Sequence, residues 1–133
     1  MKKLFLILPL LLFFVSCKKD NVSVPQKETI QSQYILDGEY VGTFIRDTTV
    51  TNITLQLDSN KFNGTSNVEY FPAIGGGTFT IIDNDSIEFN DKNFWTADFD
   101  WTLILKNKWH YDYSNDTLLL VNQIDDKYTL VKQ

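Results

Sequence analysis

The sequence predicts an all-β domain built as an antiparallel up-and-down meander. Three observations indicate this: the composition, the alternation of apolar with polar residues in short runs, and the turn residues between those runs. The chain contains 2 Ala but 13 Thr and 11 Asn, and Ala favours helix whereas Thr and aromatic residues favour strands. Asn and Asp tolerate the left-handed backbone of tight turns, so their clusters mark chain reversals.

The alternating pattern predicts eight or nine short strands within residues 36–133. In residues 53–57, for example, Ile53, Leu55 and Leu57 alternate with polar residues, as expected for a strand with one buried face. Residues 99–105 show the strongest pattern and are predicted to form a strand that carries Trp101 on its inward face. The predicted strands span residues 38–45, 53–57, 62–68, 79–81, 87–89, 99–105, 109–113, 118–121 and 128–131.

The short connections between these strands predict how the sheet closes. Hairpins join antiparallel neighbours, whereas parallel strands need crossovers of a dozen residues or more. A closed meander has no exposed edge strand. We therefore expect a small closed β-barrel, and the alternative is a two-sheet β-sandwich.

The first 16 residues predict a signal peptide. A short basic start precedes residues 4–15, an apolar run of 12 residues that is too short to cross about 30 Å of hydrocarbon. The run ends at Ser16 and Cys17, and this order resembles the lipobox of bacterial lipoproteins. The resemblance implies cleavage after Ser16 and fatty acylation of Cys17, which anchors the chain to a membrane. The alternative is an ordinary secretory signal or a short uncleaved anchor.

The residues after the cleavage site predict a tether. Residues 17–35 are polar, without a sustained period, and are expected to hold the acylated Cys17 and a flexible linker. Lys18 follows the cysteine, where an Asp would indicate retention in the inner membrane. We therefore expect an outer-membrane lipoprotein, on either the periplasmic face or the cell surface.

Charge and cysteine content exclude several function classes. Removal of residues 1–16 leaves 10 basic against 17 acidic residues, which disfavours a nucleic-acid partner because phosphate binding depends on Lys and Arg. Cys17 is the only cysteine, so an internal disulfide and a cysteine-based zinc site are excluded.

Two short motifs carry a family resemblance. Residues 38–44, which contain Gly38, Tyr40, Gly42 and Phe44, resemble the opening strand of lipocalin-like domains, and residues 96–101, ending in Trp101, resemble a later motif of that family. Together with the lipobox, the chain resembles small bacterial lipoproteins with a lipocalin-like domain. The resemblance implies that these residues pack one end of a barrel and take no part in catalysis.

No arrangement of residues predicts catalysis, and no cofactor or metal is implied. Asp98 and Asp100 would share one face of the predicted strand about 7 Å apart, but a solvent-facing pair is the expected interpretation. His110 is expected to point to solvent between Trp109 and Tyr111. There is no Gly-x-Ser-x-Gly motif, and the glycines at 75–77 lack the Lys of a phosphate-binding loop.

Two predicted loops carry large aromatic residues that are candidates for ligand binding. Phe71 lies in one loop, and Phe94 and Trp95 lie in the other. Exposed aromatic side chains supply contact area with few rotatable bonds, and their faces stack on sugars. The alternative is that these residues plug one end of the barrel.

These observations favour a non-enzymatic, lipid-anchored envelope module. Its expected partners are the membrane, through the anchor, and a small apolar ligand, a glycan or an envelope protein. The alternatives are a structural or accessory subunit of an envelope complex, and a hydrolase that uses Asp98 or Asp100.

Overall fold

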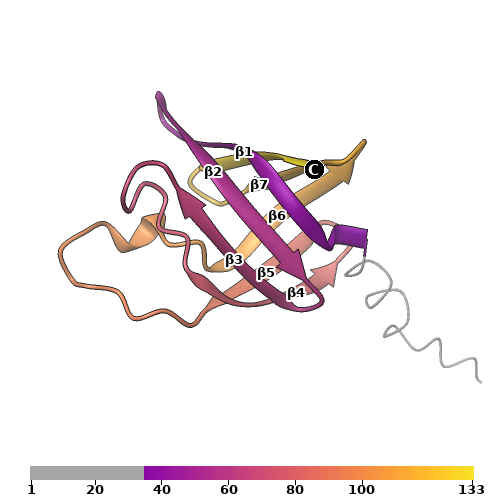
Figure 1. Cartoon of the computed structure of the whole chain (residues 1–133), viewed down its shortest axis with the longest axis horizontal. Helices are drawn as coiled ribbons and strands as arrows, with labels where there is room; N and C mark the ends of the chain where they lie inside the picture. Colours follow the sequence, from indigo (N-terminus) through magenta and orange to yellow (C-terminus); the bar gives the residue numbers. More distant parts are fainter. Residues whose placement is uncertain (1–34) are drawn as a thin grey trace, which may run out of the picture.

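The computed structural model describes residues 35–133, which form one closed barrel of eight antiparallel strands (Figure 1). Each strand pairs with the next in sequence, and β8 pairs with β1 to close the sheet. The prediction of an all-β meander closed into a barrel is therefore confirmed, and the sandwich alternative is wrong. The strands are β1 (Gly38–Arg46), β2 (Thr49–Asp58), β3 (Lys61–Ser66), β4 (Gly76–Asp83), β5 (Ser86–Asp91), β6 (Asn107–Ser114), β7 (Thr117–Val121) and β8 (Lys127–Lys132).

Side chains of alternate residues fill the interior of the barrel. In β2, every second residue from Thr51 to Leu57 is buried and its neighbours are exposed, as the two-residue period of a strand requires. Aromatic rings meet in the centre, where Tyr128 lies 4.8 Å from Phe44 and 5.2 Å from Trp109 between ring centroids. The buried strand residues that point inward include Tyr40, Phe44, Ile53, Leu55, Leu57, Phe62, Phe79, Ile81, Ile87, Phe89, Trp109, Tyr111, Leu118, Leu120, Tyr128 and Leu130.

Gly42 allows β1 and β8 to approach closely where the barrel closes. A Cβ atom at Gly42 would lie 2.0 Å from the carbonyl oxygen of Thr129 and 2.9 Å from Cα of Leu130. No side chain fits at these distances, so the closure requires glycine at this position. Nearby, the Tyr40 hydroxyl donates a 2.7 Å hydrogen bond to the carbonyl oxygen of Leu36, a buried residue that precedes β1.

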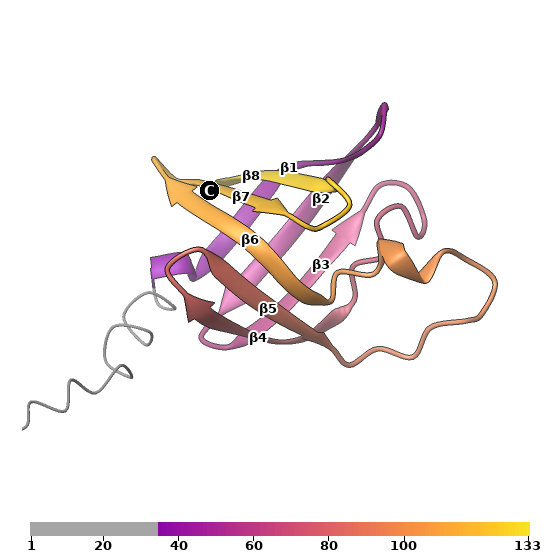
Figure 2. The ribbon, with the colours of Figure 1, turned by 180° about the vertical axis from the view of Figure 1, so that it is seen from behind.

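The two ends of the barrel differ in the segments that cover them (Figure 2). We call one end the loop end; it carries the β1–β2 turn at residues 47–48, the long segments 67–75 and 92–106, and the β7–β8 turn at residues 122–126. The opposite end carries three short turns and the point where the described chain begins. Among residues 35–133, no helix is long and apolar enough to cross a membrane.

The predicted strand at residues 99–105 is wrong. These residues belong to the long segment between β5 and β6, and Trp101–Leu103 form a short 3-10 helix, η1. Trp101 is 48 % exposed, so it is not part of the barrel interior and does not pack one end of it as the lipocalin-like motif implied. Because no strand forms here, the 7 Å separation expected for Asp98 and Asp100 on one face of a strand does not apply. Apolar alternation alone misled the prediction, because Leu103 and Leu105 are buried by contacts with another loop.

The predicted signal peptide, Cys17 and most of the predicted linker lie outside the described residues. The barrel itself occupies residues 38–132.

Candidate binding site at the loop end

The two long segments plug the loop end of the barrel. They hydrogen-bond through Ala73, whose N–H donates to the carbonyl oxygen of Leu103 and whose own carbonyl accepts from the N–H of Leu105, each at 3.0 Å. All three side chains are buried. Phe71 packs edge-on against Phe44 at 5.6 Å between ring centroids. This end of the barrel is therefore closed by a small apolar layer that continues the core.

Arg46, the only arginine of the chain, ties the segment 92–106 to the barrel. It is the last residue of β1, and its side chain is 15 % exposed. Its Nε donates to Oδ1 of Asp126 at 2.7 Å, and its Nη2 donates to Oδ2 of the same carboxylate. Its Nη1 donates to Asp100 at 3.0 Å and to the Thr102 hydroxyl at 2.9 Å. One side chain thus connects β1, η1 and the β7–β8 turn.

The Asp126 carboxylate is buried, and hydrogen bonds to both of its oxygens offset the free-energy cost of burial. Its side chain is 2 % exposed, and an unpaired charge at such a site would be costly. Besides Arg46, Asn122 donates to it from Nδ2 at 3.0 Å. Hydrogen bonds from Arg46 to Asp126 raise the pKa of the guanidinium above its ordinary value, although burial opposes this. Asn122 also accepts from the N–H groups of Ile124 and Asp126, which fixes the turn.

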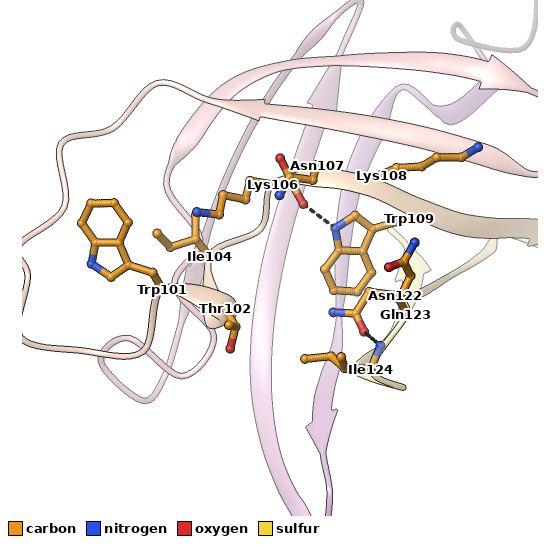
Figure 3. A pocket seen from close by; sticks show the side chains of 10 residues that line it. All are labelled: Trp101, Thr102, Ile104, Lys106, Asn107, Lys108, Trp109, Asn122, Gln123 and Ile124. Carbon is orange, nitrogen blue, oxygen red and sulfur yellow. Dashed lines mark hydrogen bonds between the residues drawn. The ribbon is translucent and has the colours of Figure 1, made fainter.

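An open pocket of about 500 Å³ lies between η1, the start of β6 and the β7–β8 turn (Figure 3). We call it the loop-end pocket. Its volume lies within the range of small-ligand sites. It is lined by Trp101, Thr102, Ile104, Lys106, Asn107, Lys108, Trp109, Asn122, Gln123 and Ile124.

Aromatic and aliphatic side chains form the apolar surface of the loop-end pocket. Trp101 is 48 % exposed and Ile124 is 60 % exposed, so both present apolar surface to the pocket. The Trp101 indole N–H donates to the carbonyl oxygen of Thr96 at 2.8 Å, and Nζ of Lys106 lies 5.4 Å from the Trp101 ring centroid. Trp109 belongs to the core, and its indole N–H donates to the carbonyl oxygen of Lys106 at 3.0 Å (Figure 3).

The polar side chains that line the loop-end pocket fall into two groups, those that hold the pocket together and those that are available to a ligand. Asn122 and Thr102 are already occupied by hydrogen bonds that hold the pocket together. The side-chain amides of Asn107 and Gln123, by contrast, make no hydrogen bond to another residue of the described chain. Within residues 35–133, no carboxylate forms an ion pair with Lys106 or Lys108.

A second pocket of about 330 Å³ adjoins the first. The two pockets share Trp101, Ile104, Lys106 and Asn107. The lining of the second pocket also includes Phe94 and Trp95.

The structure separates the three aromatic residues predicted to bind a ligand. Phe71 lies in the plug, as the alternative interpretation predicts, in which these residues close one end of the barrel. Trp95 is half-buried; it donates through Nε1 to Asp91 and packs edge-on against Tyr70 at 6.2 Å between centroids. Phe94 is fully exposed.

Most residues of the loop-end pocket were not predicted from the sequence. Residues 106–108 and Gln123 fall between predicted strands, where no sequence pattern indicates a site. The available signal was the length of segment 92–106, because long loops within small domains are often functional.

His110, Asp98 and Asp100 are exposed, and none of them lines the loop-end pocket. His110 points outward as predicted, with Nδ1 3.7 Å from Oδ2 of Asp85. Asp98 is exposed in a loop, and Asp100 accepts from the backbone and hydroxyl of Thr102. In the described part of the chain, no group of three or more His, Cys, Asp and Glu side chains is placed to hold a metal ion.

Comparisons with protein-family models, with curated proteins and with solved structures find no match for this chain. The lipocalin-like resemblance therefore rests on the short motifs alone. The geometry of the loop-end pocket is the remaining guide to function.

Proposed function

We propose that this chain is a non-enzymatic, lipid-anchored module of the bacterial cell envelope that binds glycans in the loop-end pocket. The anchor rests on Cys17, and the outer-membrane location rests on the residues that follow it. The observation that carries glycan binding is that one pocket is lined both by the exposed Trp101 and by two unpaired amides, Asn107 and Gln123.

This combination suits sugars for chemical reasons. A sugar ring presents C–H groups on its faces, which pack against an aromatic ring, and hydroxyl groups at its edge. A carboxamide both donates and accepts hydrogen bonds, so it can pair with hydroxyls in either role. The packed interior supports a ligand at the loop end in preference to one inside the barrel, because Phe44 and Tyr128 occupy the centre.

A glycan array probed with the full-length protein in detergent tests the proposal. We expect binding to a subset of glycans, and Trp101→Ala should weaken it about tenfold, equivalent to roughly 1.4 kcal/mol. Ile82→Ala is the matched control, because Ile82 is 46 % exposed on β4 away from the pocket. Absence of binding by folded wild-type protein, or equal loss in both variants, would overturn the proposal.

A second candidate function is that of an interaction subunit in an envelope complex. It is favoured by the outer face of β1 and β8, where Val41 and Val131 are paired in register and are 42 % and 47 % exposed. Chemical crosslinking in intact membranes should then yield a defined adduct that Val41→Lys abolishes. An adduct pattern unchanged by that substitution would count against this function.

A further inference from the structure

We infer that the loop-end pocket selects an acidic oligosaccharide, with Lys106 binding a carboxylate of the sugar and the second pocket holding a neutral neighbouring unit. This inference rests on the proposed function and adds the class and polarity of the ligand.

The charge of the loop-end pocket is opposite to that of the chain. The chain has 17 acidic and 12 basic residues, yet the charged residues that line this pocket are Lys106 and Lys108, with no carboxylate in the lining. A concave site lined by one sign of charge attracts ligands of the other sign. The pocket is therefore complementary to an anion in a molecule that otherwise repels anions.

Two carboxylates that accept hydrogen bonds from lining residues of the loop-end pocket are also bound by Arg46. Asp126 is buried beneath Arg46 and Asn122. Asp100 accepts from Arg46 and from Thr102. Neither of these acidic groups has to be satisfied by the two lysines.

Lys106 is the better placed of the two lysines. Its ammonium group lies 5.4 Å from the centroid of the Trp101 ring, and this contact orients the side chain while leaving N–H donors free for a ligand. Lys108 lies opposite Glu88 in the register of β5 and β6, its charge interacts with that of Asp83, and its side chain extends away from Trp101 (Figure 3). We expect Lys106 to contribute more to binding.

The second pocket gives the ligand a direction. Because both pockets share Lys106 and Trp101, a chain of sugars can pass from one to the other across this pair. The second pocket is lined by a carboxylate, Asp91, which accepts from the Trp95 indole. A second acidic sugar would be repelled there, so the neighbouring unit is neutral.

The experiment uses the same array, with every acidic glycan presented both in its native form and after chemical reduction of its carboxylates to alcohols. We expect glycans that alternate acidic with neutral sugars to bind, and their reduced forms to bind about fivefold more weakly, as for an exposed ion pair at the upper end of its range. Lys106→Gln should reproduce this loss for the native glycan and weaken binding of the reduced glycan by a smaller factor, because the reduced glycan has no carboxylate for Lys106 to bind. Lys61→Gln, on β3 outside both pockets, is the matched control.

The outcomes separate the two proposals. Equal binding of native and reduced glycans, or wild-type binding by Lys106→Gln, would overturn the acidic preference and leave glycan binding intact. Tighter binding of fully acidic glycans than of alternating ones would overturn the role of the second pocket. If no glycan binds, both the inference and the proposed function fail.

Discussion

Arg46 and Asp126 form a two-point ion pair between the end of β1 and the β7–β8 turn, 80 residues apart in the sequence. The same guanidinium reaches Asp100 and Thr102 beside η1. Asn122, which lines the loop-end pocket, binds the other side of the Asp126 carboxylate. The pocket therefore has a polar base whose geometry depends on one arginine.

Arg46→Met is expected to lower the free energy of unfolding by about 3 kcal/mol or more, because it leaves the Asp126 carboxylate buried without its cation. Urea denaturation followed by circular dichroism measures the change. The double variant Arg46→Met with Asp126→Leu removes both charges and should recover much of the loss. If Arg46→Met alone is as stable as the wild type, the ion pair does not stabilise the fold.

Acid should loosen the segment 92–106 before the barrel unfolds. Hydrogen bonds from Thr102, with the charge of Arg46 adding to them, lower the pKa of Asp100 below its ordinary value. A carboxyl group whose pKa is lower in the folded state contributes stability at any pH above 3.8, its ordinary pKa. This contribution is lost as the pH falls from 3.8 through the lower pKa of the folded state.

The amide resonance of Thr102 should report this titration, since its N–H donates to Asp100 at 2.9 Å. In Asp100→Asn the resonance should show no such step. A step that persists unchanged in Asp100→Asn would assign the transition to another group.

Removal of the hydroxyl group should change the free energy of unfolding differently at Tyr128 and at Tyr40. Among the residues described, the buried Tyr128 hydroxyl has no hydrogen-bond partner, whereas the Tyr40 hydroxyl donates to Leu36. Tyr128→Phe is expected to leave the free energy of unfolding unchanged or to raise it by about 1 kcal/mol, and Tyr40→Phe to lower it by about 1 kcal/mol. Thermal and urea denaturation of the pair measure the difference, and a destabilised Tyr128→Phe would show that its hydroxyl is satisfied.

Alkaline pH should destabilise the barrel. Burial raises the pKa of Tyr128 well above 10.0, the ordinary value for a tyrosine. Below pH 10 the phenol is protonated in both states and its contribution is complete; above pH 10 the unfolded chain ionises first, so stability falls by about 1.4 kcal/mol per pH unit for this group. Tyr128→Phe should reduce the slope of stability against pH above 10, and an unchanged slope would contradict this assignment.

Gly42→Ala should prevent normal closure of the barrel. The added methyl group would lie 2.0 Å from a backbone oxygen that cannot move without separating β1 from β8. We expect a loss of roughly 3 kcal/mol or failure to fold, at the upper end of overpacking effects. Gly76→Ala is the control, because its closest contact would be 3.2 Å, and similar stability of the two variants would argue against close approach at Gly42.

The barrel could be predicted from the sequence because its strands follow a local rule. The inward positions of β2 from Ile53 to Leu57 are apolar, as are the buried positions Tyr128 and Leu130 of β8, and every turn contains Asn or Asp. The alternation of residues and the positions of the turns therefore predict the same strands. Residues 99–105 show the same period, yet they do not form a strand. Long-range contacts decide their structure: Ala73 pairs with Leu103 and Leu105, and Arg46 binds Thr102.

The loop-end pocket could not be predicted for a related reason. Its wall residues come from η1, from the first residues of β6 and from the β7–β8 turn, which meet only after the barrel closes. The alternation of apolar residues predicts that Trp101 lies inside the sheet, whereas the structure places it at the surface. No local sequence pattern marks Asn107 or Gln123 as a pocket residue.

The described chain begins and ends at the same rim of the barrel, where Lys132 donates to the carbonyl oxygen of Ile35 at 3.2 Å and the N–H of Gln133 donates to Glu39 at 2.9 Å. A fluorescent reporter or an affinity tag fused after Gln133 would therefore project from the end of the barrel opposite the loop-end pocket. Immobilised through such a tag on a sensor chip, every molecule would present its loop end to the passing sample.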